Sequence, residues 1–307
     1  MIDLHHDLLS IMYYSYIRND YTYLEKWLKC FRDDNVSGLL ANLYFMSREE
    51  MLEEMGDREI DVVEMFEKST AMFKKYLPDE KVIFSIEGCD YIKDTEELEQ
   101  LYRLGLRNIL LVWNNPNKYG SGNRGDYGLT KEGENFLLKA IDLGISIDLS
   151  HMNKKTFYDT IELIRKEQSL GKDVKVIASH SNSFNLYNHE RNLDDEQIKA
   201  LKSVGGVLGL VSYSTFVCEG SNLEELREKY LEHINKAVDI LGIDNVCVSS
   251  DDMTFANNLF GGDYLMLFDY NSINKDLRCL LSRQYSEEDI DKIMYKNIYE
   301  KLFKEDL

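Results

Sequence analysis

The sequence has 307 residues, is 44% hydrophobic and carries a formal net charge of −19. This length suits one large α/β barrel, and with no linker or boundary signal we expect a single domain over residues 1–307. A charge of −19 repels phosphate backbones and anionic lipid surfaces, which excludes nucleic acid and membranes as expected partners.

The remaining bulk features point to the cytoplasm. No stretch approaches the roughly 20 apolar residues of a membrane span, and no basic region followed by an apolar run opens the chain, so we expect no signal peptide. The five cysteines are scattered and form no CxxC pair. We therefore expect reduced thiols in a cytoplasmic protein.

Short apolar runs alternate along the chain with amphipathic stretches. The runs are residues 2–9, 36–46, 81–87, 107–113, 145–151, 174–180, 205–212 and 245–251. The helical stretches include residues 51–73, 95–104, 130–143, 154–166 and 223–241, with Asp94, Thr130 and Ser286 as N-caps. Strands that alternate with helices form parallel βαβ units, and eight such units predict a closed (β/α)₈ barrel of the TIM type. An open doubly wound sheet is the alternative, but no GxGxxG follows the first strand.

Ionisable residues gather at the ends of these predicted strands, where such barrels carry their active sites. Because side chains alternate along a strand, His5 and Asp7 point to one side and His6 to the other. The complete set is His5, Asp7, Glu87, His151, His180, Asp251 and Asp252.

This set of side chains indicates a metal centre at the C-terminal ends of the strands. Burying so many ionisable groups together is costly unless a cation compensates them. Imidazole and carboxylate are the ligands of zinc, and also of manganese, iron or cobalt. Five ligands with Glu87 in the middle predict two ions, roughly 3.5–4 Å apart, that hold a hydroxide between them. Asp251 would then orient that water and move its proton.

Several segments, taken in order, resemble the membrane (renal) dipeptidase family, binuclear zinc hydrolases of the amidohydrolase type. The opening Asp-Leu-His-His-Asp-Leu at residues 3–8 resembles the D-x-H-x-D-L start of that family, and the likeness continues through SIEG at residues 85–88. Further matching stretches are residues 128–151, 178–198, 205–210 and 245–251.

The resemblance implies a role for each matching residue. One metal would be bound by His5 and Asp7 and the second by His151 and His180, with Glu87 bridging, Asp251 beside the nucleophilic water and Arg191 on the substrate's terminal carboxylate. A guanidinium fork suits that last task because it binds a carboxylate bidentately.

The sequence departs from the family pattern near the substrate. Many members have a histidine after the fourth strand that contacts the scissile carbonyl oxygen, whereas this chain has Trp113, followed by Asn114 and Asn115 as substitutes. We expect Trp113 and Asn114 to contact the substrate. The family's D-F-D-G after the eighth strand reads Asp-Asp-Met-Thr at residues 251–254. A glycine-rich stretch, residues 119–128, is either a mobile loop at the pocket rim or an ordinary surface loop.

Three functions are compatible with this pattern. The leading hypothesis is a cytoplasmic, zinc-dependent dipeptidase with two divalent ions, in which a metal-bridging hydroxide attacks the peptide bond of a dipeptide. Trp113 keeps open another binuclear amidohydrolase, acting on a lactone, a cyclic amide or a deamination substrate. The third is a non-catalytic binding module, against which the intact ligand set argues. The resemblance also leaves a homodimer open.

Overall fold

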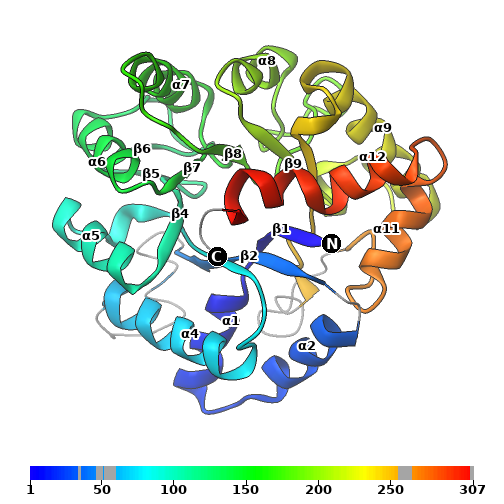
Figure 1. Ribbon diagram of the computed structural model, residues 1–307, viewed down its shortest axis with the longest axis horizontal. Coiled ribbons are helices and arrows are strands. Elements are labelled where there is room, and N and C mark those ends of the chain that lie inside the picture. The colour runs from blue at the N-terminus through cyan, green and yellow to red at the C-terminus, as the bar shows by residue number, and fades with distance from the viewer. Residues whose placement is uncertain (34–35, 46–50, 52–59, 255–264, 305–307) are drawn as a thin grey trace.

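The computed structural model describes residues 1–33, 36–45, 51, 60–254 and 265–304 (Figure 1). Within these residues, parallel strands form one eight-stranded sheet in the order β1-β2-β3-β4-β7-β8-β9-β10. The first and last strands contact each other, so the sheet closes into a barrel. The strands are β1 Ile2–His6, β2 Gly38–Tyr44, β3 Val82–Glu87, β4 Leu106–Leu110, β7 Ser146–Asp148, β8 Val176–Ala178, β9 Val207–Val211 and β10 Val246–Ser249. The predicted (β/α)₈ barrel is confirmed.

Helices surround the barrel, as Figure 1 shows. They are α1 Leu8–Arg18, α2 Thr22–Asp33, α4 Val62–Tyr76, α5 Thr95–Leu104, α6 Lys131–Asp142, α7 Lys154–Ser169, α8 Asp195–Ser203, α9 Leu223–Leu241, α11 Ile273–Leu281 and α12 Glu287–Asp291. The N-cap side chains of Asp94, Thr130 and Ser286 accept backbone N–H bonds as predicted. The predicted helix over residues 51–73 is observed from Val62, and residues 52–59 lie outside the described part. Among the described helices, none is long and apolar enough to cross a membrane.

A buried carboxylate joins the two strands that close the barrel. Asp3 of β1 accepts from the backbone N–H of Ser250 at 2.8 Å and from its hydroxyl at 2.5 Å. The Tyr270 hydroxyl donates to the same carboxylate at 3.1 Å. Burial raises the pKa of Asp3 to about 6, although these hydrogen bonds oppose the rise. The closure therefore holds the end of β10 against β1, where the predicted site residues lie.

The C-terminal segment packs against the barrel interior. Two wide helical turns, Lys292–Lys296 and Tyr299–Phe303, follow α12, and this red segment crosses in front of the strands in Figure 1. Leu302 and Phe303 pack in one apolar cluster with Ile2, Leu4 and Cys247 from the strands. One end of the barrel is thereby filled with apolar side chains, which leaves the other end for polar groups.

This packing gives a testable stability prediction. Phe303 is 1% exposed, so Phe303→Ala should lower the free energy of unfolding by about 3–5 kcal/mol through lost burial and the cavity left behind. Chemical denaturation measures this change. Glu300→Ala, at an exposed position of the same turn, is the control and should change stability by less than about 0.5 kcal/mol. Equal effects of the two substitutions would show that the segment is not packed on the barrel.

Candidate metal centre

The ionisable residues predicted at the strand ends lie together in the structure, except Asp252. Its carboxylate accepts from Trp27 Nε1 at 3.4 Å and lines a different cavity. His5 belongs to β1 and Glu87 ends β3, whereas His151, His180 and Asp251 follow β7, β8 and β10 by two or three residues. The side chains of His5, Glu87, His151 and His180 are buried, and that of Asp251 is 13% exposed. His6 is turned away from this cluster and packs against Trp27, with ring centroids 3.7 Å apart and the ring planes tilted by 55°. The alternation along β1 therefore separates the two adjacent histidines as predicted.

Glu87 lies at the centre of the cluster and offers a different oxygen to each side. Its Oε2 is 3.3 Å from His5 Nε2, whereas its Oε1 is 2.6 Å from His151 Nε2 and 3.6 Å from His180 Nε2. Burial alone would raise the pKa of Glu87, but the imidazoles of His5 and His151 hold it well below its usual range. An ionised carboxylate with one oxygen toward each set of imidazoles has the form of a bridging ligand.

The contacts of His151 leave its Nε2 atom without a proton, so that a lone pair faces the centre of the cluster. Its Nδ1 lies 2.9 Å from Oδ1 of Asn114, and because a carboxamide oxygen only accepts, Nδ1 carries the ring proton. Burial, followed by the positive charge of Arg191, lowers the pKa of His151 to about 4. Its Nε2 is therefore a lone pair that faces Glu87 and lies 2.9 Å from Nε2 of His180. Such acceptors tolerate this proximity when a proton or a metal cation lies between them.

The other side of the cluster is rich in negative charge. His5 Nε2 lies 3.7 Å from Asp7 Oδ1 and 3.9 Å from Asp251 Oδ1. Burial would lower the pKa of His5, but the carboxylates of Glu87, Asp251 and Asp7 outweigh it and raise the pKa to about 10. Burial raises the pKa of both Asp7 and Asp251. Asp7 Oδ1 is buried with no hydrogen-bond partner in the described part of the chain.

Two groups of ligand atoms are therefore close enough to hold a cation. The atoms of His5, Glu87 and His180 lie within 4.8 Å of one another, and so do those of His5, Asp7 and Asp251. Imidazole nitrogen and carboxylate oxygen are the donors that zinc and related divalent metals take. The residues present fit a metal centre, and His5 is the residue common to both groups.

Uncharged side chains hold the distal nitrogens of the imidazoles. Asn42 Nδ2 lies 3.0 Å and Ser179 Oγ 3.3 Å from His5 Nδ1. The same Ser179 hydroxyl lies 2.8 Å from His180 Nδ1, so one oxygen contacts an imidazole from each half of the centre. Sequence reasoning missed Asn42 and Ser179, although Asn42 stands out as the polar residue of an otherwise apolar strand. The Ser179 hydroxyl can accept from an imidazole N–H and so fix the ring's orientation, whereas the Asn42 amide nitrogen can only donate to His5 Nδ1.

Two of the site residues adopt a backbone conformation that side chains disfavour. His151 has φ +68° and Asp251 has φ +46°, which for residues other than glycine costs about 1–3 kcal/mol each. The backbone N–H of Asp251 donates to the carbonyl oxygen of His5 at 3.1 Å. This bond joins the two strands that close the barrel. The strained turn therefore holds the Asp251 carboxylate close to His5.

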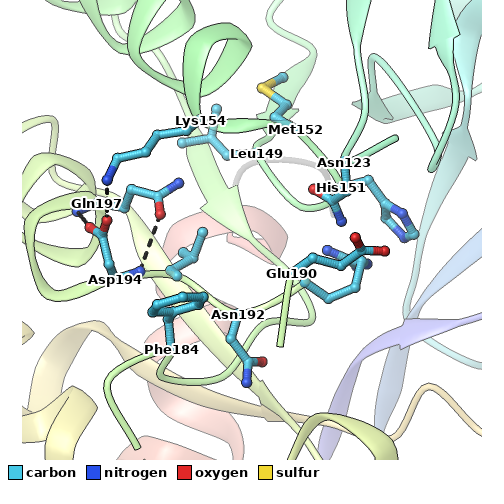
Figure 2. Close-up of a pocket in the computed structure, with 12 residues that line it drawn as sticks. Asn123, Leu149, His151, Met152, Lys154, Phe184, Glu190, Asn192, Asp194 and Gln197 are labelled. Atoms are coloured by element: carbon cyan, nitrogen blue, oxygen red, sulfur yellow. Dashed lines mark hydrogen bonds and ion pairs between the residues drawn. The ribbon is translucent and has the colours of Figure 1, made fainter. Parts of the chain in front are cut away.

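A cavity of about 200 Å³ opens beside the centre, lined by His151, Arg191 and Asn123 among others (Figure 2). Arg191 is 6% exposed, and its Nη2 has no hydrogen-bond partner among the described residues. Its guanidinium carbon lies 5.6 Å from the ring centroid of Phe216. Burial lowers the pKa of Arg191 to about 10, so the group stays charged at neutral pH. A buried cation with an unused N–H group is suited to bind an anion.

The predicted substrate contacts after β4 lie near the centre. The ring of Trp113 is half-buried, with its centroid 6.1 Å from that of His151. Asn114 uses its carboxamide oxygen to accept from His151. The structure thus gives Asn114 a positioning contact that the sequence did not indicate, while contact of either residue with substrate stays a prediction.

Comparison with known proteins identifies related chains. The family model of the membrane dipeptidases (peptidase family M19) matches residues 20–305. An uncharacterised protein in the pqqA 5′ region of Klebsiella pneumoniae is 28% identical over 70% of this chain and 79% of its own. The dipeptidase tcpJ of Claviceps purpurea is 25% identical over 70% of this chain, which spans about half (51%) of that protein's length.

Solved structures share the fold. A metallopeptidase from Rhodobacter sphaeroides, solved with a phosphinate mimic of the dipeptide L-Ala-D-Ala, superposes with a TM-score of 0.75 at 22% identity over 98% of both chains. The probable dipeptidase PvdM from Pseudomonas aeruginosa has a TM-score of 0.71 at 17% identity and covers 90% of this chain and 87% of its own.

The cluster predicts that divalent cations stabilise the folded protein. Zn²⁺ that binds the folded state at a hundredfold excess over Kd should raise the free energy of unfolding by about 2.7 kcal/mol. Glu87→Gln removes the shared negative charge and should abolish most of this gain, as thermal denaturation with and without Zn²⁺ will measure. The control is Glu162→Gln on the exposed face of α7, which should keep the full gain. An undiminished gain in Glu87→Gln would contradict the bridging role.

Zinc affinity should also rise with pH. Although burial opposes it, the surrounding carboxylates raise the pKa of His5 to about 10, so its imidazole retains a proton that a cation must displace. Raising the pH removes this competition, and the affinity should increase between about pH 6 and pH 8. Titration calorimetry in buffers of different ionisation enthalpy should detect the released protons. A pH-independent affinity without proton release would place the ion elsewhere.

Proposed function

The chain belongs to the membrane dipeptidase family, peptidase family M19, and from this premise we propose how its barrel cleaves a dipeptide and which residues take part. The resemblance read from the sequence motifs is thereby confirmed, and the chain is a metallo-dipeptidase. The family match begins at residue 20, so the assignment of His5 and Asp7 rests on the geometry of β1.

We propose that the centre holds two Zn²⁺ ions. The observation that carries this proposal is the division of Glu87, whose Oε2 faces His5 and whose Oε1 faces His151 and His180. His5 and Asp7 would bind one ion and His151 and His180 the other. When bound, such ions polarise the scissile carbonyl and lower the pKa of a coordinated water.

Asp251 would handle the proton in this reaction. Burial raises the pKa of its carboxyl group, which brings the group closer to the range where it accepts a proton and returns it near neutral pH. Its Oδ1 lies 3.9 Å from His5 Nε2, so it borders the centre without replacing the closer ligands. In this proposal the carboxylate would take a proton from the attacking water and give it to the leaving amine.

Arg191 would select substrates with a free C-terminal carboxylate. It is buried in the cavity that also contains His151, so a carboxylate held there lies close to the centre. The cavity of about 200 Å³ is smaller than the roughly 300–1,000 Å³ of pockets for drug-sized ligands. A small cavity that contains a buried cation favours dipeptides over longer chains.

Trp113 supports a second candidate, an amidohydrolase that acts on a lactone or a cyclic amide. An indole N–H donates one hydrogen bond and carries no charge, so a developing oxyanion receives less help from it than from a histidine at that position. Substrates whose carbonyl is more reactive than a peptide's need less of that help.

Hydrolysis of L-Ala-L-Leu with added Zn²⁺ tests the leading proposal. The free acid should be cleaved with a kcat/KM at least about 10²-fold above that of the C-terminal amide, because the amide forfeits the ion pair with Arg191. Arg191→Lys keeps the charge but loses the fork, and should reduce the preference for the free acid about tenfold, mainly through KM.

The control for this experiment is Arg165→Lys on α7, whose guanidinium contacts Ser203 on α8 and lies outside the cavity lining. It should leave both rates unchanged. Cleavage of the amide as fast as the free acid would refute the role of Arg191. Hydrolysis of a lactone with none of any dipeptide would establish the second candidate instead.

A further inference from the structure

The cavity beside the centre has two chemically different ends (Figure 2). At one end lie His151, Asn123 and Glu190; at the other lie Lys154, Asp194 and Gln197, with Leu149 and Phe184 between them. A bound residue therefore meets a different set of partners at each end.

The end near the centre contains two unused hydrogen-bond donors. Nη2 of Arg191 and Nδ2 of Asn123 are both buried, and neither has a hydrogen-bond partner within the described residues. Both side chains line the same cavity. An unsatisfied buried donor costs about 1–3 kcal/mol, and a ligand in the cavity that both residues line could accept from them. A carboxylate offers two oxygens for this purpose.

The backbone around Asn123 is fixed against the loop that follows β4. Gly122 pairs with Met152 in an isolated bridge, and the N–H of Arg124 donates to the carbonyl oxygen of Asn114 at 2.8 Å. A Cβ atom on Gly122 would lie 1.9 Å from the carbonyl oxygen of Trp113, so the chain can approach this closely only with glycine there. Asn123 is thus held in place before any ligand binds, which lowers the entropy lost on binding.

The far end of the cavity has its charges already paired. Lys154 Nζ lies 2.5 Å from Asp194 Oδ2, and the Gln197 side chain accepts from the backbone N–H of Asp194 at 3.1 Å. The wall between the two ends is formed by Leu149, Met152, Phe184 and Leu193. A charged group placed against this wall would lose hydration without gaining a partner.

We propose that Asn123 is a second donor to the terminal carboxylate of the substrate and that the apolar wall selects an uncharged side chain on the C-terminal residue. This inference rests on the proposed role of Arg191 and goes beyond it. It names a substrate-positioning residue from the loop after β4 and a class of dipeptide, those ending in an apolar residue. With the carboxylate on Arg191 and Asn123, the side chain of that residue lies toward Leu149 and Phe184.

Binding of the cleavage-product class tests the proposal without requiring turnover. L-Leucine, L-leucinamide and L-aspartate are titrated into the zinc-loaded protein by calorimetry. Leucine should bind at least about tenfold more tightly than either of the other two, because leucinamide lacks the carboxylate and aspartate brings a charge to the apolar wall. Asn123→Ala should weaken leucine about tenfold to a hundredfold and leave leucinamide unchanged. Asn123→Asp, which opposes the ligand carboxylate with another, should weaken leucine further.

Asn188→Ala, at an exposed position, is the matched control and should leave all three affinities unchanged. If Asn123→Ala weakens leucine and leucinamide equally, the residue only supports the loop, and the proposal is overturned. It is also overturned if wild-type protein binds aspartate as tightly as leucine. These affinity ratios are obtained whether or not a dipeptide is cleaved, so failure here is distinct from failure of the dipeptidase assay.

Discussion

The structure around the barrel mouth depends on one carboxylate, that of Glu87, which contacts His5 with one oxygen and His151 and His180 with the other. Glu87 is 2% exposed and ionised, and a buried charge of this kind persists only when opposite charge lies against it. Protons on the imidazoles meet this need in part, but His151 presents a lone pair because Asn114 faces its other nitrogen. The cluster is therefore built for cations, and the closure of the barrel serves to bring its members from separate strands to one point.

The groups that orient the imidazoles are uncharged, and this matters for the balance of charge. Asn42, Ser179 and Asn114 contact the distal nitrogens of His5, His180 and His151. Carboxylates in these places would make the imidazoles more basic and add negative charge to a centre that already has three acidic groups. With amides and a hydroxyl instead, bound cations keep more of their charge for the substrate. Arg191 is a buried positive charge in the cavity beside this centre, and in the proposed function it would meet the substrate's carboxylate.

The sequence predicted the barrel and the cluster because both follow from short-range rules. Eight apolar runs give the strands, and the ends of parallel strands meet at one rim, so His5, Glu87 and His151 could be placed without coordinates. Neither the contact of Asn114 with His151 nor the place of Asn123 in the cavity could be predicted in this way. Their positions depend on the path of the chain after β4, where Pro116–Asn117 (β5) and Gly120–Ser121 (β6) form a small antiparallel hairpin. That path is set by tertiary contacts such as the fit of Gly122 against Trp113, which no local periodicity reveals.

The same loop connects the two halves of the site. Asn114 accepts from a proposed metal ligand, and Asn123, nine positions later in the chain, lines the cavity with an unused donor. The hydrogen bond from Arg124 to Asn114 ties these two asparagines together. The placement of Asn123 relative to His151 is therefore set by this short segment, whereas Arg191 comes from the loop between β8 and α8.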